Sequence, residues 1–311
     1  MRRALPALFS TALLLAAAPA LTRQVPPAAA RPAPAQPAPE VTREADPALW
    51  VVKDEDTTVY LFGTIHVLKP GLGWFDEAVK KAFDSSGELV VEMVEGAGAD
   101  ADAIRRRAVA APDAPPLSER LPEDKRAAFA RAVSALGVPP ETFDRFQPWF
   151  AAVTLVQAPV GKLGYKAEDG VERRLMAAAE AAGKPMIGLE TFDQQVGFLA
   201  GLSEEAQLRF LVSTVDEIGD TEKVFNEMID SWSKGDPERL ARLMNDTLKD
   251  EPEVEARLLT NRNKAWAGWI AERMKRPGTV FLAVGAGHLA GPSSVQAQLR
   301  NHGLAAERVP Y

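Results

Sequence analysis

Two short segments of the chain share an apolar run that ends in the pattern Gly-x-x-His. They cover residues 59–66 and 280–288, and they hold two of the three histidines of the chain, His66 and His288. Glycine at the end of a strand lets the backbone turn sharply or approach a ligand, and a histidine just beyond it reaches the crevice at the carboxyl edge of a sheet. We therefore predict that both histidines lie at one sheet edge and belong to one active site.

Two glutamates also follow strand-like segments. Glu92 interrupts the apolar run 89–94, and Glu190 follows the apolar run 186–189. Burial of a carboxylate is costly unless a cation, a proton or hydrogen-bond donors compensate its charge. The structural alternatives are that Glu92 faces solvent from an edge strand and that Glu190 opens the first turn of the following helix.

Two imidazoles with one or two carboxylates form a ligand set that suits a divalent metal ion such as zinc, manganese, cobalt or iron. An open coordination position on such an ion would hold a water molecule with a lowered pKa. We expect His66, Glu92 and His288 to be the metal ligands, with Glu92 or Glu190 as a further ligand or general base. The third histidine, His302, is expected to cap a helix or lie on the surface.

Residues 261–274 form a helical pattern with polar side chains at its start. Trp266 and Ile270 lie at helical spacing, which is typical of a buried stripe, and Arg262 would then be the solvated end of that stripe. In the functional alternative, Arg262 and Asn263 turn inward and steady an oxyanion or a carboxylate. The substrate is then expected to contact Trp266 and the glycines of both motifs, Gly63, Gly285 and Gly287.

Strand-like segments lie toward both ends of the chain, and helical patterns dominate its middle. This order predicts an α/β (α+β) fold with a central mixed sheet, flanking helices and a large helical insertion. Residues 97–167 and a long block over residues 192–275 carry most of the helical pattern. Strands are expected at residues 49–53, 57–62, 88–94, 184–190, 279–284 and near 305–309.

Residues 1–20 have the charged start, apolar core and small-x-small cleavage site of a secretory signal peptide. Residues 21–45, rich in Pro and Ala, are expected to form a disordered linker, and residues 46–311 a single domain. The apolar core of residues 1–20 is shorter than the roughly 20 residues of a membrane span. An uncleaved membrane anchor is therefore the weaker alternative. We therefore expect secretion across the inner membrane into the periplasm, without a stable membrane span in the mature form.

Composition limits the kinds of partner. The formal net charge of −7 becomes −9 once the two arginines of residues 1–20 are removed, and no long basic run follows. We therefore expect no nucleic acid partner. The chain has no cysteine, so an exported form must rely on a packed core and not on disulfides.

Five motifs in this sequence resemble those of a known family: residues 60–66, 89–92, 188–191, 262–266 and 284–292. Together they are similar to the TraB/GumN family, which resembles the Tiki metalloproteases and the haem-binding ChaN-like and erythromycin-esterase-like proteins. The resemblance extends over about residues 49–309 and leaves residues 97–167 without a matching motif.

The resemblance implies a metal-dependent hydrolase, with manganese or cobalt suggested by the Tiki branch. His66, Glu92 and His288 match the motif positions tied to activity in that family. We expect an exported metal-dependent hydrolase, peptidase-like, that cleaves a peptide or small amide with a metal-activated water. Two alternatives remain: a non-catalytic periplasmic binding protein for haem, a peptide signal or a partner protein, and a metal-free hydrolase in which His and Glu act as acid and base.

Overall fold

The computed structural model describes residues 41–94, 101–245, 248 and 250–311. The predicted signal peptide, residues 1–20, and most of the predicted linker lie outside the described residues. Within the described stretches, we find no helix that is long and apolar enough to cross a membrane.

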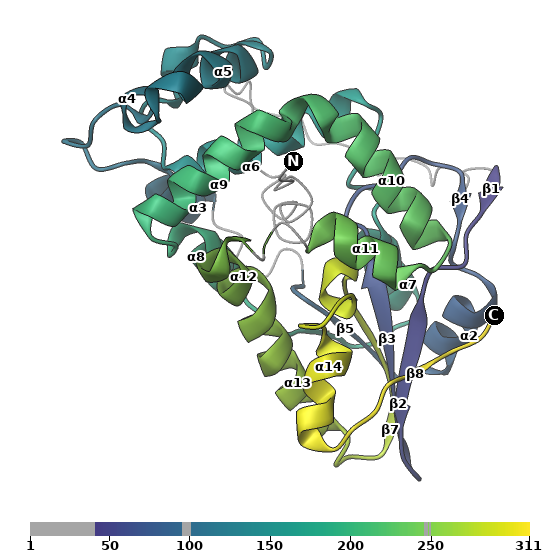
Figure 1. Cartoon of the computed structure of the whole chain (residues 1–311). Helices are drawn as coiled ribbons and strands as arrows, with labels where there is room; N and C mark the ends of the chain where they lie inside the picture. The colour runs from purple at the N-terminus through teal and green to yellow at the C-terminus, as the bar shows by residue number, and fades with distance from the viewer. Residues whose placement is uncertain (1–40, 95–100, 246–247, 249) are drawn as a thin grey trace, which may run out of the picture.

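A six-stranded mixed sheet forms the centre of the molecule (Figure 1). Its strands are β2 (Leu49–Lys53), β3 (Thr57–Thr64), β5 (Glu88–Val91), β6 (Met186–Gly188), β7 (Gly278–Gly285) and β8 (Glu307–Arg308). The spatial order is β6-β5-β7-β3-β2-β8, with β6, β5, β7 and β3 parallel to one another. The strand β2 forms a hairpin with β3, and β8 pairs antiparallel to β2. This arrangement confirms the predicted central mixed sheet.

A second sheet has two short parallel strands, β1 (Arg43–Glu44) and β4 (Leu72–Gly73). The N–H groups of Thr42 and Arg43 both donate to the carbonyl oxygen of Gly71, at 2.8 and 3.2 Å. The last residues of the segment predicted as linker are therefore hydrogen-bonded to the turn that follows His66.

Helices flank the sheet and form the predicted insertion. Figure 1 shows most of those between β5 and β7, in teal and green, gathered beside one end of the sheet. Gly201, Gly235 and Pro252 divide the predicted helical block 192–275 into separate helices. The helices are α2 (Glu77–Ser85), α3 (Ala101–Ala108), α4 (Leu117–Arg120), α5 (Glu123–Ser134), α6 (Pro148–Lys162), α7 (Val171–Ala181), α8 (Phe192–Ala200), α9 (Glu204–Glu217), α10 (Thr221–Ser233), α11 (Pro237–Met244), α12 (Pro252–Glu255), α13 (Asn261–Arg273) and α14 (Val295–Leu299).

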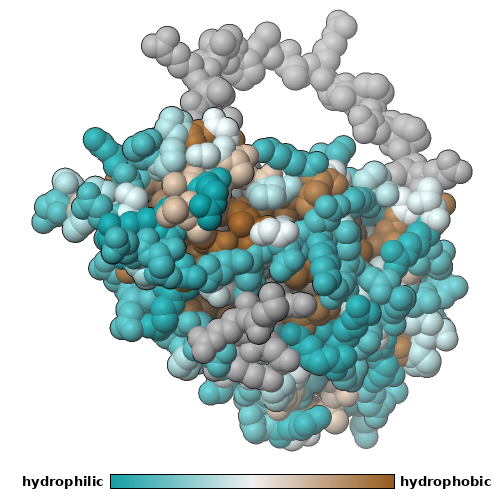
Figure 2. Space-filling model, turned by 45° about the horizontal axis from the view of Figure 1, so that its top comes forward, coloured by the Kyte–Doolittle hydropathy of each residue, from teal (hydrophilic) through white to brown (hydrophobic). Residues whose placement is uncertain are grey.

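Helices cover both faces of the sheet, so its strands are apolar on both sides. Val59 and Leu61 of β3 belong to one core, which includes Trp266 and Ile270 of α13 and extends to α14. Phe62 belongs to a larger core with α2, α7 and the insertion. The predicted stripe of α13 is therefore a core face. Figure 2 shows apolar surface, in brown, in the hollows between polar helices of the insertion.

The segment that carries His66 lies tightly against the start of α7. The N–H of Val171 donates to the carbonyl oxygen of Ile65 at 3.0 Å. Gly170 is so close that a Cβ there would lie 2.0 Å from the carbonyl oxygen of His66. Its φ of −61° is ordinary, so glycine is required at this position for space.

We predict that Gly170→Ala destabilises the protein, because backbone on one side of this contact would have to move. The expected loss in unfolding free energy, measured by urea denaturation, is about 2 kcal/mol or more. Gly161→Ala in α6 is the matched control, since no atom lies within 4 Å of its Cβ position. The control should gain up to about 1 kcal/mol. Equal stability of the two variants would contradict the close approach.

Candidate functional site

Four neighbouring parallel strands end at one edge of the sheet, and a predicted site residue follows each. Thr64 of β3 is level with Gly285 of β7. Val91 of β5 is level with Ala283 of β7 and with Gly188 of β6. The two Gly-x-x-His motifs therefore share one edge, as predicted. The residues brought to this edge are His66, Glu92, Glu190 and His288.

Arg262 connects three of these residues. Its Nε and Nη2 donate to the two carboxylate oxygens of Glu190, both at 2.8 Å, and Nη2 also donates to Glu92 Oε2 at 2.5 Å. Its Nη1 donates to Nε2 of His288 at 3.0 Å and to the carbonyl oxygen of Leu258 at 3.3 Å. All five guanidinium N–H groups therefore have an acceptor.

The position of Arg262 follows from its place in the first turn of α13. A π-helical turn, Ala256–Thr260, immediately precedes this helix. The guanidinium lies between the rings of Phe198 and Trp266, at 5.2 and 4.7 Å from their centroids. Its side chain is 1% exposed, so the expectation of a solvated arginine at the end of the stripe is wrong. Arg262 turns inward because two carboxylates compensate its charge.

Glu92 is buried at the centre of the sheet edge. Because β5 lies between β6 and β7, the edge-strand alternative for this residue is wrong. Its Oε1 accepts a hydrogen bond from the N–H of Gly285 at 2.7 Å. Burial raises the pKa of Glu92 and the charge of Glu190 adds to this, whereas Arg262 and His66 oppose the increase.

Glu190 also turns its carboxylate toward the site, although it is not needed to cap the helix that follows it. Thr191 is the N-cap of α8 and forms a capping box with Gln194, so the start of this helix is capped without Glu190. The carboxylate accepts from Gln195 Nε2 at 3.1 Å as well as from Arg262. The helix-terminus alternative therefore does not describe its role.

His288 is completely buried and has a definite hydrogen-bond pattern. Its Nε2 faces an arginine, which only donates, so Nε2 accepts. Its Nδ1 lies 2.6 Å from Oδ1 of Asn263, whose Nδ2 donates to the carbonyl oxygen of Ser293 at 2.7 Å. We infer the neutral Nδ1–H tautomer from these partners. Burial, with the nearby charges of Arg262 and His66, lowers the pKa of His288 well below 6.5.

His66 lies beside a carboxylate that the sequence analysis missed. Its Nδ1 is 2.6 Å from Oε1 of Glu172, and the hydroxyl of Thr64 donates to the same oxygen. Burial alone would raise the pKa of Glu172, but His66 and these hydrogen bonds outweigh burial and lower it. Glu172 stands in the first turn of α7, where acidic residues are common, so no sequence signal marks it.

His66 is also the more open of the two motif histidines. Its side chain is 10% exposed, compared with 0% for His288 and 4% for Glu92. The charge of His66 opposes the rise of the Glu92 pKa and contributes to the fall of the His288 pKa. The site therefore has a buried part around Arg262 and a more accessible part at His66 and Glu172.

The motif glycines support the turns at this edge. Gly63 packs against Ala286, and its carbonyl oxygen accepts from Trp232 Nε1 at 2.7 Å. The carbonyl oxygen of Gly287 accepts from Asn245 Nδ2 at 2.9 Å. The ring of Trp266 lies 4.5 Å from that of His288, between centroids. Substrate contact by Gly63, Gly285, Gly287 and Trp266 stays a prediction.

The arrangement does not suit a metal ion as it stands. In the part of the chain that the structure describes, no group of three or more His, Cys, Asp or Glu residues is placed to hold one. The guanidinium of Arg262 lies among Glu92, Glu190 and His288, and it uses the lone pair of His288 Nε2. A metal ion bound by the predicted ligands His66, Glu92 and His288 through Nε2 of His288 would have to displace Arg262 from that nitrogen. The predicted Mn, Co or Zn site stays untested.

We predict that Arg262→Met strongly destabilises the protein, because it leaves two buried carboxylates without their cation. The unfolding free energy should fall by about 3–5 kcal/mol in denaturant titrations at neutral pH. Arg257→Met, in the preceding turn, removes a half-exposed arginine whose Glu253 partner is 3.9 Å away. This control should cost about 1 kcal/mol or less. A similarly small loss for Arg262→Met would mean that the guanidinium does not compensate these charges.

A second prediction concerns pH. Because the pKa of His288 is lowered in the native state, the unfolded chain takes up a proton below about pH 6.5 that the native chain does not. Through this group, stability should fall by about 1.4 kcal/mol for each pH unit below about 6.5. His288→Gln should remove that part of the slope when unfolding is measured between pH 7 and 5. An unchanged slope would contradict a neutral buried His288, and His302→Gln is the control.

A model of the TraB/PrgY/gumN family matches residues 48–308. The chain is 26% identical over 258 residues to "Uncharacterized protein YbaP" of Escherichia coli (strain K12) and of Shigella flexneri, covering 82% of this chain and 92% of each relative. An "Uncharacterized protein" of Treponema pallidum (strain Nichols) is 25% identical over 278 residues, covering 83% of this chain and 81% of that protein. No solved structure matches the chain. The extent of the family match establishes that this chain belongs to the TraB/PrgY/gumN family.

Proposed function

We propose that the chain is a hydrolase of peptides or small amides in which His66 is the general acid–base group and Glu172 orients it. The observation that carries this proposal is the His66–Glu172 pair, 2.6 Å apart, at the carboxyl edge of the sheet. A carboxylate on Nδ1 of a histidine fixes the ring and stabilises the imidazolium that forms when the other nitrogen takes a proton. This is the metal-free interpretation of the His and Glu residues.

In this proposal, Nε2 of His66 takes a proton from a water molecule as the water oxygen attacks the carbonyl carbon of the substrate. The imidazolium then gives that proton to the amide nitrogen as the C–N bond breaks. The products are a carboxylic acid and an amine, and His66 returns to its neutral form. Glu172 keeps its negative charge throughout, which the lowered pKa of this group supports.

The buried part of the site has a positioning role. Arg262 and Asn263 use their hydrogen-bonding groups on Glu92, Glu190, His288 and Ser293, so they are engaged before any substrate arrives. The charge of His66 lies close enough to Glu92 to oppose the rise of the Glu92 pKa. Steadying of an oxyanion by Arg262 or Asn263 would require these bonds to rearrange.

The location and the substrate class rest on sequence features. A signal peptide in residues 1–20 and the acidic, cysteine-free composition support work in the periplasm on exported peptides or envelope amides. A metal-dependent hydrolase with Mn, Co or Zn remains the rival proposal, and it requires that Arg262 leave its present position. A binding protein for haem or a peptide is the second rival.

We predict that the whole mature chain hydrolyses members of a broad peptide and amide library. His66→Gln removes the base, and Glu172→Gln keeps the shape but removes the charge that stabilises the imidazolium. Each should lower turnover by about 10²–10⁴, while circular dichroism and thermal unfolding show a folded protein. His302→Gln, at an exposed histidine outside the site, is the control and should keep wild-type turnover.

A chelator separates this proposal from its rivals. Hydrolysis that survives extensive treatment with EDTA supports the acid–base mechanism. Loss of activity with EDTA and its return with manganese, cobalt or zinc would contradict that mechanism and support the metal-dependent rival. A folded chain that cleaves no library member but binds haem or a peptide would contradict both hydrolase proposals.

A further inference from the structure

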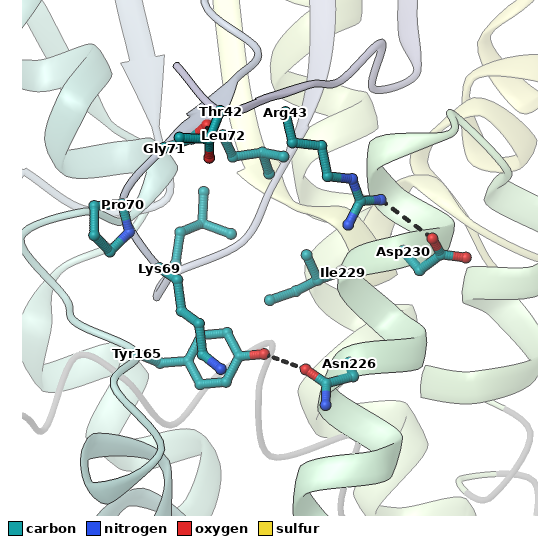
Figure 3. Close-up of a pocket in the computed structure, with 11 residues that line it drawn as sticks. Thr42, Arg43, Lys69, Pro70, Gly71, Leu72, Tyr165, Asn226, Ile229 and Asp230 are labelled. Atoms are coloured by element: carbon teal, nitrogen blue, oxygen red, sulfur yellow. Dashed lines mark hydrogen bonds and ion pairs between the residues drawn. The ribbon is translucent and has the colours of Figure 1, made fainter. Parts of the chain in front are cut away.

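A pocket of about 440 Å³ opens beside the segment that carries His66 (Figure 3). This volume is within the range of small-molecule sites in proteins. Four parts of the chain form its walls: β1, the turn at residues 68–72, the residue Tyr165 ahead of α7, and one face of α10. None of the candidate catalytic residues lines it, so it is a separate feature.

Two cations border the pocket. In Figure 3 the side chain of Lys69 reaches over Tyr165, and its ammonium lies 4.6 Å from the ring centroid. Among the described residues, no carboxylate is paired with Lys69. Arg43 donates to Asp230 at 3.2 Å, but Asp230 also accepts from Lys234 at 2.8 Å. The lining residues therefore carry two positive charges and one negative charge, in a protein whose formal net charge is negative.

Neutral donors and apolar groups complete the lining. The hydroxyl of Tyr165 donates to Oδ1 of Asn226 at 2.5 Å, which orients the Nδ2 of Asn226 as a donor on the same wall. Burial raises the pKa of Tyr165, and nearby Glu222 adds to this, so its hydroxyl stays protonated. The apolar part of the lining comes from Leu68, Pro70, Leu72 and Ile229.

We propose that this pocket binds a small carboxylate that has an apolar body. Lys69 and Asn226 would hold the carboxylate, because an ammonium and an amide N–H are strong donors to it. Leu72 and Ile229 would contact the apolar body. The C-terminal residue of a peptide and a free aliphatic acid share this chemistry.

The fold connects this pocket to the loop of His66. Leu68 lines the pocket, and it exchanges two backbone hydrogen bonds with Lys166, at 3.2 and 3.0 Å. Lys166 follows Tyr165, and the same loop continues to Gly170, which lies against the carbonyl oxygen of His66. A bound carboxylate would therefore lie beside the segment that positions His66. The proposal concerns binding alone and does not depend on the proposed hydrolase activity.

Isothermal titration calorimetry of the whole mature chain tests this proposal with three probes. N-acetyl-leucine carries the carboxylate, N-acetyl-leucinamide is its uncharged match, and octanoate is a free aliphatic acid. We expect the acid to bind about tenfold more tightly than the amide. Lys69→Met should weaken binding of the acid by about tenfold, and Asn226→Ala should weaken it as well. Lys53→Met, at an exposed lysine of β2, is the control and should bind as the wild type does.

Each outcome either supports or contradicts binding of a carboxylate in this pocket. Tighter binding of N-acetyl-leucine than of octanoate identifies a peptide C-terminus as the ligand class, and the reverse order identifies a free aliphatic acid. Equal binding of acid and amide, binding that Lys69→Met leaves unchanged, or no binding of either acid at millimolar concentration would overturn it. Lys69 and Asn226 are exposed, and circular dichroism checks that both variants stay folded.

Discussion

The buried guanidinium of Arg262 is the constraint on which this edge of the sheet depends. Two carboxylates and an imidazole converge where four parallel strands end, and all three are buried. Buried carboxylates of this kind require a compensating cation in fixed geometry. Arg262 supplies it with all five N–H groups, and this ties α13 to the loops after β5, β6 and β7.

Because of this constraint, the two copies of the Gly-x-x-His motif have different roles. His288 accepts from Arg262 and donates to Asn263, so it is a neutral and fixed part of the core. His66 pairs with Glu172 in a more exposed position. The similar sequences therefore have dissimilar environments, and the proposed chemistry is assigned to His66 for this reason.

The strand ends could be predicted from the sequence because apolar runs and Gly-x-x-His patterns are local signals. An inward Arg262 beside a carboxylate was one of two predicted alternatives, but the sequence could not decide between them, since Glu190 and Glu92 lie 72 and 170 positions away along the chain. A first-turn arginine on an amphipathic helix usually faces solvent. Glu172 was missed for a related reason: only the folded contact of α7 with the loop after β3 distinguishes it from any acidic residue at a helix start.

The most direct test of this account is a crystal structure of the protein grown with manganese, with anomalous diffraction data collected to locate any metal. We expect the Arg262 guanidinium between Glu92 and Glu190, with His288 Nε2 accepting from it and no manganese at that position. A manganese ion bound by His66, Glu92 and His288, with Arg262 moved aside, would contradict it.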